Sequence, residues 1–282
     1  MTAATRSFPD TSISGFDHAA YLTRIGVEDP VAPTLPGLTR LMERHMAAIP
    51  FEAIDVLLGG VPDLAPSAVD LKLVTNRRGG YCFEHASLFR RMLEASGFAV
   101  ETFLARVRLR TGFEGPVPPA THAVLVVSID GESYLADVGF GGPMPNQPLR
   151  LLGDDPQETR GGVFRIRALA DGRVVERATG DAWLPLYEIL PLRCHPADLT
   201  LANWFVATHP TSSFRNLLMA ARLDGDVRYT LAGNRFSLRR SDGEFEVRHL
   251  TAGEVMETLA DQFRLPVVAE WDAAIAPALG EW

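Results

Sequence analysis

A cysteine at the expected start of a helix is the first residue of this sequence that could carry out chemistry. Cys82 lies in residues 76–84, where it follows two arginines, two glycines and a tyrosine. The glycines let the backbone turn sharply into the helix, and the helix N-terminus offers unpaired N–H groups and the positive end of a dipole. The adjacent arginines add positive charge. Because this setting favours a thiolate, it predicts a nucleophile rather than a small buried apolar side chain.

A nucleophilic cysteine needs a base, and His122 is the histidine best placed to be one. It stands near the start of an apolar segment, residues 120–129, that we expect to be a strand, and Asp130-Gly131 is a strong hairpin signal directly after it. Pairing across that turn puts Val124 opposite Asp137 and His122 opposite Gly139. His122 and Asp137 then lie on one face as diagonal neighbours, about 7–8 Å apart at the backbone. The pattern predicts a catalytic triad in which Asp137 orients the base.

The other candidate residues fit the chemistry less well. His85 is a rival base because it follows Cys82 by three positions on the same helix, but the sequence shows no partner for it. His45 lies on an apolar helix face, which is typical of a core or interface histidine. Cys194 has no glycine-arginine entry, so we interpret it as structural. No set of three or four ligands with zinc spacing is present, and we predict no metal site.

A glycine-rich segment follows the predicted triad aspartate. Gly139 and Gly141 flank Phe140, so the backbone can approach a ligand closely with the aromatic ring as a wall. We therefore predict that these three residues contact substrate. The segment lacks the spacing and the surrounding βαβ unit of a dinucleotide-binding loop, which argues against that class of fold.

The elements that must position these residues change character along the chain. The first eighty residues are helical in pattern, and the nucleophile helix should run from Tyr81 to Ser96, with Gly97 after its end. Strand signals then predominate and indicate a small antiparallel barrel or curled sheet, and both types mix after Pro196. The predicted later elements are strands at 100–107, 120–129, 133–138, 162–167, 173–178, 183–189, 229–238 and 244–249, and helices at 197–207 and 251–263.

Composition narrows the class of protein. The 282 residues are 46% hydrophobic and 22% charged, which is typical of a folded globular protein. A net charge of −8 argues against nucleic acid or an anionic membrane surface as a general partner, although an arginine-rich stretch at 77–110 leaves room for a local cationic site. The N-terminus has no apolar region of a signal peptide, and no apolar run is long enough to span a bilayer. Two widely spaced cysteines predict a reduced, cytoplasmic protein.

Several segments together resemble one enzyme family. RGGYCFE at residues 78–84 looks like the signature of the arylamine N-acetyltransferases, and DVGFG at 137–141 is similar to the family's aspartate segment. His122 with the aliphatic strand behind it resembles the family's histidine segment. The resemblance continues through 183–187 and 203–214, and it covers nearly the whole chain.

The resemblance implies an α+β fold with three parts. These are a helical bundle that carries the nucleophile (1–97), an antiparallel β-barrel that carries the histidine and the aspartate (98–195), and an α/β lid (196–282). The catalytic core would be like that of cysteine proteases and transglutaminases. Ala53 and Ala86 depart from the family pattern, which commonly has asparagine at both positions, and this puts fine positioning in question rather than the triad.

The resemblance also implies a reaction. Acetyl-CoA, as co-substrate rather than bound cofactor, would acetylate Cys82, and the acetyl group would pass to the nitrogen of a small aromatic amine, hydrazine or hydroxylamine. His122 would act as the general base and general acid, and the backbone N–H of Cys82 would stabilise the oxyanion. Phe140 and Phe205 would line an aromatic pocket, with Tyr81 as a further substrate contact, and the arginine-rich stretch could meet the phosphates of CoA. The chain would act as a monomer or homodimer.

Three other functions are compatible with part of the pattern. An ansamycin-type amide synthase, which forms macrolactams from carrier-bound polyketides, resembles the same family and uses the same triad. A cysteine peptidase or transglutaminase uses the same kind of catalytic triad, but the RGGYCFE segment argues against either activity. A binding protein that kept the fold without catalysis is disfavoured because all three triad residues are present.

Overall fold

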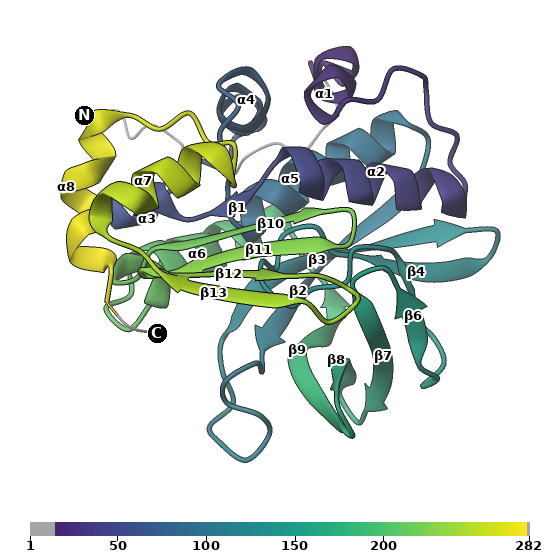
Figure 1. Ribbon diagram of the computed structural model, residues 1–282. Coiled ribbons are helices and arrows are strands. Elements are labelled where there is room, and N and C mark those ends of the chain that lie inside the picture. Colours follow the sequence, from purple (N-terminus) through teal and green to yellow (C-terminus); the bar gives the residue numbers. More distant parts are fainter. Residues whose placement is uncertain (1–14, 281–282) are drawn as a thin grey trace, which may run out of the picture.

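The computed structural model describes residues 15–280, which form a helical part, a β-barrel and a second sheet (Figure 1). Residues 1–14, where we predicted no signal peptide, lie outside the described residues. The first part is helical, as its pattern indicates. Its elements are α1 (His18–Ile25), α2 (Leu35–Ala48), α3 (Ile54–Leu57), α4 (Pro66–Asp70), the π-helical turn η1 (Leu71–Thr75) and α5 (Cys82–Ala95), with the short strand β1 (Phe51–Glu52) between α2 and α3.

The middle of the chain forms an eight-stranded antiparallel sheet in the order β5-β4-β3-β2-β9-β8-β7-β6. Its strands are β2 (Ala99–Val107), β3 (Ala120–Ile129), β4 (Glu132–Ala136), β5 (Leu149–Arg150), β6 (Gln157–Thr159), β7 (Gly162–Leu169), β8 (Gly172–Thr179) and β9 (Ala182–Arg193). The side-chain amide of Gln157 on β6 bonds to the backbone of Arg150 on β5 in both directions, at 2.6 and 2.9 Å. These bonds bring the two edge strands together, so the sheet is a nearly closed barrel.

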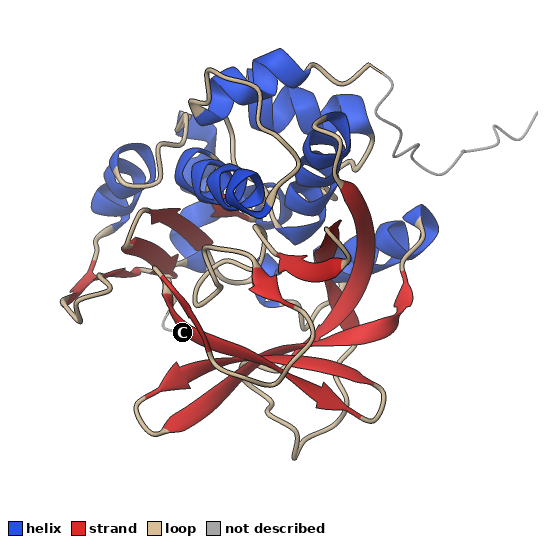
Figure 2. Cartoon of the chain, turned by 90° about the vertical axis from the view of Figure 1, so that its right-hand side faces the viewer, coloured by secondary structure: helices blue, strands red, loops and turns tan. Residues whose placement is uncertain are grey.

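The last part of the chain builds a second sheet and the helices that pack on it. Its order is β1-β10-β11-β12-β13, with β10 (Met219–Asp224), β11 (Val227–Ala232), β12 (Arg235–Arg239) and β13 (Phe245–His249). The remaining helical elements are α6 (Pro196–Thr208), η2 (Ser213–Arg215), α7 (Ala252–Asp261), η3 (Ala269–Trp271), α8 (Asp272–Ile275) and η4 (Ala276–Ala278). Figure 2 shows the helices gathered on one side of the molecule and the barrel strands on the other.

The hydrophobic core explains why these parts meet at α5. The predicted buried face of that helix is confirmed, because Leu88, Phe89, Met92 and Leu93 have no exposed surface. They belong to one apolar cluster with the inward side chains of β3, such as Val127. Burying side chains of this size stabilises a fold by about 1.5–3 kcal/mol each. The helix that carries the cysteine is therefore packed directly against the strand that carries the histidine.

The α+β fold class is confirmed, one predicted strand is wrong, and one strand was not predicted. Residues 229–238 are not one strand, because Gly233 turns the chain with φ +59 and separates β11 from β12. We predicted no element at β10, whose Met-Ala-Ala segment favours a helix, yet β10 is an inner strand between β1 and β11. The three-part division at 97 and 195 stays a prediction. No helix among residues 15–280 is long and apolar enough to cross a membrane.

Candidate active site

Helix α5 begins at Cys82, and a glutamate in its first turn satisfies the backbone N–H of the residue before it. The backbone N–H of Tyr81, the N-cap, donates to the Glu84 carboxylate at 3.1 Å. The chain enters through Gly80, where a Cβ would lie 2.8 Å from the same carboxylate and would displace it. Cys82 thus occupies the first helical position, where backbone N–H groups have no partner within the helix.

The hairpin of β3 and β4 has the predicted register. Leu125 pairs with Ala136, and Asp130 and Gly131 both have positive φ, at +51 and +82, as a two-residue type I′ turn requires. Beyond the last paired residues, His122 Nε2 and Asp137 Oδ2 approach to 2.8 Å. The expectation that these two side chains reach each other is therefore confirmed.

Cys82, His122 and Asp137 meet in a nearly dry environment, each with at most 4% of its surface exposed. The second Asp137 oxygen, Oδ1, accepts the Gly139 N–H at 2.9 Å, so the carboxylate is fixed at both oxygens. The thiol of Cys82 lies 3.7 Å from the Thr121 carbonyl oxygen, one residue before the histidine. The structure brings the three predicted triad residues together.

Electrostatics make the histidine a cation at neutral pH. Burial by itself lowers the pKa of His122, but the charge and hydrogen bond of Asp137 and the adjacent Cys82 raise it to about 10. Burial likewise opposes ionisation of Asp137, whereas His122 and the Gly139 N–H hold the pKa of that carboxyl below 3.8. An imidazolium beside a cysteine stabilises the thiolate, which is the nucleophilic form.

Two aromatic rings cover the imidazole. Phe140 and Tyr187 pack against His122 with ring centroids 5.0 and 4.9 Å away, and against each other at 4.9 Å. These contacts fix the ring plane and exclude water from the His122–Asp137 bond. The resemblance included Tyr187 only as part of a segment, and its contact with the base was not predicted. The one available signal was an aromatic residue at a buried position of a strand.

The other predicted substrate contacts have clear packing roles in the structure. A Cβ on Gly139 would lie 2.9 Å from Cys82 Cα, and one on Gly141 would lie 3.1 Å from the Phe51 ring. Tyr81 is fully buried, and its hydroxyl donates to the Asn203 side-chain oxygen, which ties the start of α5 to α6. Phe205 is half-buried and stacks on His209 at 4.4 Å. Their contact with substrate stays a prediction.

Arg78, one of the two arginines before Cys82, is paired with carboxylates rather than with the thiol. Arg78 binds the carboxylates of Glu52 and Asp55, each at 2.8 Å, so its charge is compensated away from the sulfur. Lys72 bridges Asp55 and Glu84, at 2.7 Å from each. This network of two cations and three carboxylates holds the entry of α5 in place. Within the arginine-rich stretch, carboxylates also pair with Arg90, Arg91 and Arg108.

The rival base, His85, is engaged elsewhere. Its Nε2 faces the Pro50 carbonyl oxygen at 3.2 Å and must donate to it, so its Nδ1 accepts from His45 Nε2 at 2.7 Å. His45 Nδ1 in turn accepts from the Tyr21 hydroxyl at 2.6 Å. Burial is the main reason that the pKa of His85 falls to about 4, so the ring is neutral. Both of its nitrogens are occupied, and neither is available to Cys82.

Two further residue groups match no catalytic arrangement. Burial and the adjacent Asp198 raise the pKa of the Cys194 thiol to about 12, so this cysteine is a poor nucleophile at neutral pH. His45, predicted to be a core or interface residue, has no exposed surface and lies in the core. Across residues 15–280 there is no group of three or more histidine, cysteine or acidic side chains that could hold a metal ion.

Comparisons with known proteins agree on one family. A family model described as N-acetyltransferase matches residues 34–271. The arylamine N-acetyltransferase of Mycobacterium tuberculosis H37Rv is 40% identical over 254 residues, 89% of this chain and 90% of that protein. The Escherichia coli K12 enzyme of the same name is 34% identical over 249 residues, 88% of each chain. The structure of Mycobacterium marinum arylamine N-acetyltransferase in complex with CoA matches with a TM-score of 0.87 and 38% identity, and covers 93% of this chain and 98% of that one.

Proposed function

The chain belongs to the arylamine N-acetyltransferases, which are acyltransferases, and from that premise we propose that it transfers acetyl from acetyl-CoA to an aromatic amine or hydrazine through a thioester on Cys82. The observation that carries the mechanism is the buried cysteine beside an imidazolium that Asp137 holds at 2.8 Å. Homology supports the activity, and this geometry supports the route.

In the first half-reaction the Cys82 thiolate attacks the acetyl carbonyl of acetyl-CoA. The new carbon–sulfur bond forms while the carbonyl π electrons move to oxygen, and the backbone N–H of Cys82 at the helix start stabilises that oxyanion. The intermediate then expels the sulfur of CoA, which takes a proton from the His122 imidazolium. The products are acetyl-Cys82, free CoA and a neutral His122.

In the second half-reaction the amine nitrogen attacks the thioester. Neutral His122 takes a proton from the nitrogen as the carbon–nitrogen bond forms, and the Cys82 thiolate leaves. The imidazolium and the thiolate are thereby restored. Asp137 stays ionised throughout, because its role is to orient His122 and stabilise its cation. Both steps use one base and one nucleophile, and Phe140 and Tyr187 pack against that base.

The substrates follow from the family and from the site. The Mycobacterium marinum relative binds CoA, and we carry acetyl-CoA over to this chain as the acyl donor. For the acceptor, Phe140 beside the imidazole offers an aromatic face to a flat amine. The comparisons favour this function over macrolactam formation, since the relatives named above are arylamine N-acetyltransferases. A free thiol nucleophile requires reducing conditions, which the cytoplasm supplies.

The decisive test is to incubate the purified chain with acetyl-CoA alone and locate the acetyl group by peptide mass spectrometry. We expect one acetyl adduct, on Cys82, that disappears when an aniline or hydrazine is added. Cys194→Ser is the matched control and should acetylate like the parent, whereas Cys82→Ser should not form a thioester. Acetyl transfer to the amine without any Cys82 adduct in a rapid-quench time course would contradict the thioester route.

A further inference from the structure

The cavity between the second sheet and the barrel is lined by an unusual concentration of positive charge. It measures about 150 Å³ and lies where the β10–β11 and β12–β13 turns meet the barrel. Asp226 is the one acidic residue in its lining, and its carboxylate accepts the Ser241 hydroxyl at 3.4 Å. The arginines in the lining are Arg160, Arg177, Arg228, Arg239 and Arg240.

Three of these arginines have no anionic partner among the described residues. Arg228 is buried, and it donates to the carbonyl oxygens of Met144 and Gly161, at 2.9 and 3.5 Å, while its Nε has no hydrogen bond. Arg177 donates only to the same Gly161 carbonyl, and its buried Nε is also without a partner. The third, Arg239, is exposed. Carbonyl oxygens are dipoles and do not neutralise these cations.

The charges also repel one another. Burial and then the neighbouring Arg177 and Arg239 lower the pKa of Arg228 to about 9, and burial and Arg239 lower the pKa of Arg177. Buried cations are stable only when they are paired. Of the three, only Arg228 is a buried side chain, and it has no anionic partner among the described residues, so an anion bound in this cavity would compensate its charge.

We propose that this cavity binds a phosphate group, held by Arg177, Arg228 and Arg239. Guanidinium groups bind phosphate oxygens in a forked, charge-assisted geometry, and the buried Nε atoms of Arg177 and Arg228 are donors without a partner. Arg177 comes from β8 of the barrel, whereas Arg228 and Arg239 come from β11 and β12 of the second sheet. The phosphate consequently joins the two sheets. The site contains none of the triad residues and does not depend on the acetyl transfer.

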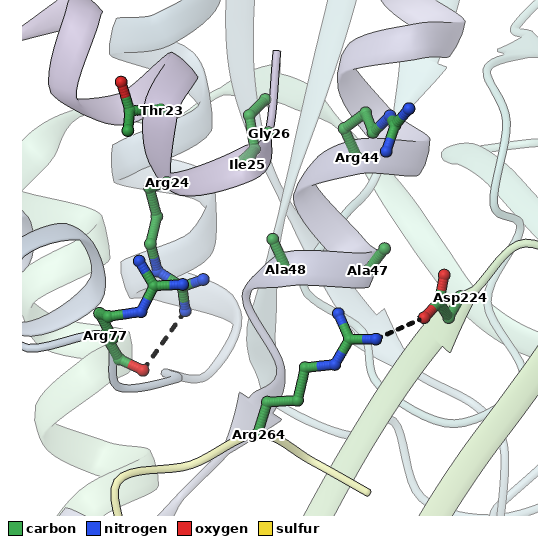
Figure 3. A pocket seen from close by; sticks show the side chains of 10 residues that line it. All are labelled: Thr23, Arg24, Ile25, Gly26, Arg44, Ala47, Ala48, Arg77, Asp224 and Arg264. Carbon is green, nitrogen blue, oxygen red and sulfur yellow. Dashed lines mark hydrogen bonds and ion pairs between the residues drawn. The ribbon is translucent and has the colours of Figure 1, made fainter.

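The proposal rests on buried arginine nitrogens that have no hydrogen bond, and a second arginine-lined cavity lacks them among the described residues. It measures about 430 Å³, and Figure 3 shows Arg264 directed at Asp224 and Arg24 directed at the Arg77 carbonyl, at 3.1 and 3.3 Å. Within residues 15–280, no buried side-chain nitrogen of this cavity lacks a hydrogen bond. Its exposed Arg44 therefore offers a control substitution of the same charge.

The test titrates the full chain with inorganic phosphate in a chloride buffer of constant ionic strength and measures heat of binding and the unfolding midpoint. We expect saturable binding and a rising midpoint. Arg239→Ala, an exposed change that leaves the core intact, should raise Kd by at least about tenfold. Arg228→Met should abolish binding and leave the phosphate-free chain no less stable, because it removes an unpaired buried cation. Arg44→Ala should titrate like the parent.

The source of the phosphate is distinguished by repeating the titration with CoA present. Competition between CoA and inorganic phosphate assigns the site to a phosphate of the nucleotide, and independent binding assigns it to free phosphate. The proposal is overturned if phosphate stabilises the chain no more than chloride does, or if Arg228→Met and Arg239→Ala both bind it as the parent does. Acetylation of Cys82 is measured on the same samples, so a failed acetyltransferase and a failed phosphate site give separate results.

Discussion

Replacing Asp137 by asparagine tests the electrostatic account of the site most directly. The pKa of His122 is about 10 against an ordinary 6.5, and at about 1.36 kcal/mol per pKa unit the imidazolium is stabilised by roughly 5 kcal/mol. In Asp137→Asn only the adjacent Cys82 opposes the effect of burial, so the pKa of His122 should fall well below 10. The imidazolium is then less stable, and the thiolate loses counter-charge. We expect acylation of Cys82 to slow by about 10³–10⁴-fold.

The assay follows a single turnover by rapid quench and measures acetyl-Cys82 by intact mass. Product release therefore does not affect the measured rate of acylation. A parallel measurement of the alkylation rate of Cys82 at pH 7 reports the reactivity of the sulfur. Alkylation should be much faster in the parent than in Asp137→Asn. Asp130→Asn is the matched control. It makes the same chemical change in the hairpin turn, where asparagine tolerates the φ of +51, and it should leave both rates unchanged.

The same substitution should also change how the free energy of unfolding depends on pH. A histidine whose pKa is raised on folding contributes stability that is complete below its unfolded pKa, near 6.5, and is lost as pH rises through about 10. The parent should therefore lose stability between these two values, and Asp137→Asn should lose much less over the same window. A folded Asp137→Asn that acylates within about tenfold of the parent rate at pH 7 would refute the reasoning.

Two further predictions follow from the packing around the triad. Gly139→Ala places a Cβ 2.9 Å from Cys82 Cα, so it should destabilise the chain by about 1–3 kcal/mol in chemical denaturation and slow acylation, whereas Gly253→Ala, which meets nothing within 4 Å, should do neither. His122→Ala should abolish acylation, but His85→Ala should keep it and lower the free energy of unfolding by about 1–3 kcal/mol, because Pro50 and His45 lose their partner. Loss of acylation in a folded His85→Ala, with acylation kept in His122→Ala, would show that the base has been misassigned.

The sequence predicts the parts of the fold whose cause is local. The start and end of α5 and the register of the β3–β4 hairpin depend on residues within a few positions of each other, such as Asp130 and Gly131. The pairing of β1 with β10 joins Phe51 to Ala221, and no local pattern encodes it. Likewise the Tyr21–His45–His85 chain assembles residues from three helices, so each histidine alone gives no signal of its partners.

The arginines before Cys82 have partners and positions that their place in the sequence does not reveal. Helix entry and arginines were expected to favour the thiolate, but Arg78 is paired with Glu52 and Asp55, and Arg77 lines the larger arginine cavity. The other features that favour the thiolate are the helix N-terminus and His122. The pKa of His122 depends on the register of the β3–β4 hairpin, because a slip of one residue would move every side chain to the opposite face. The turn at Asp130-Gly131 therefore controls the chemistry at a distance, because it selects which face of β3 presents a base to the nucleophile. The arginines serve the same end indirectly, since Arg78 holds Glu52 and Asp55 at the entry of the helix on which Cys82 stands.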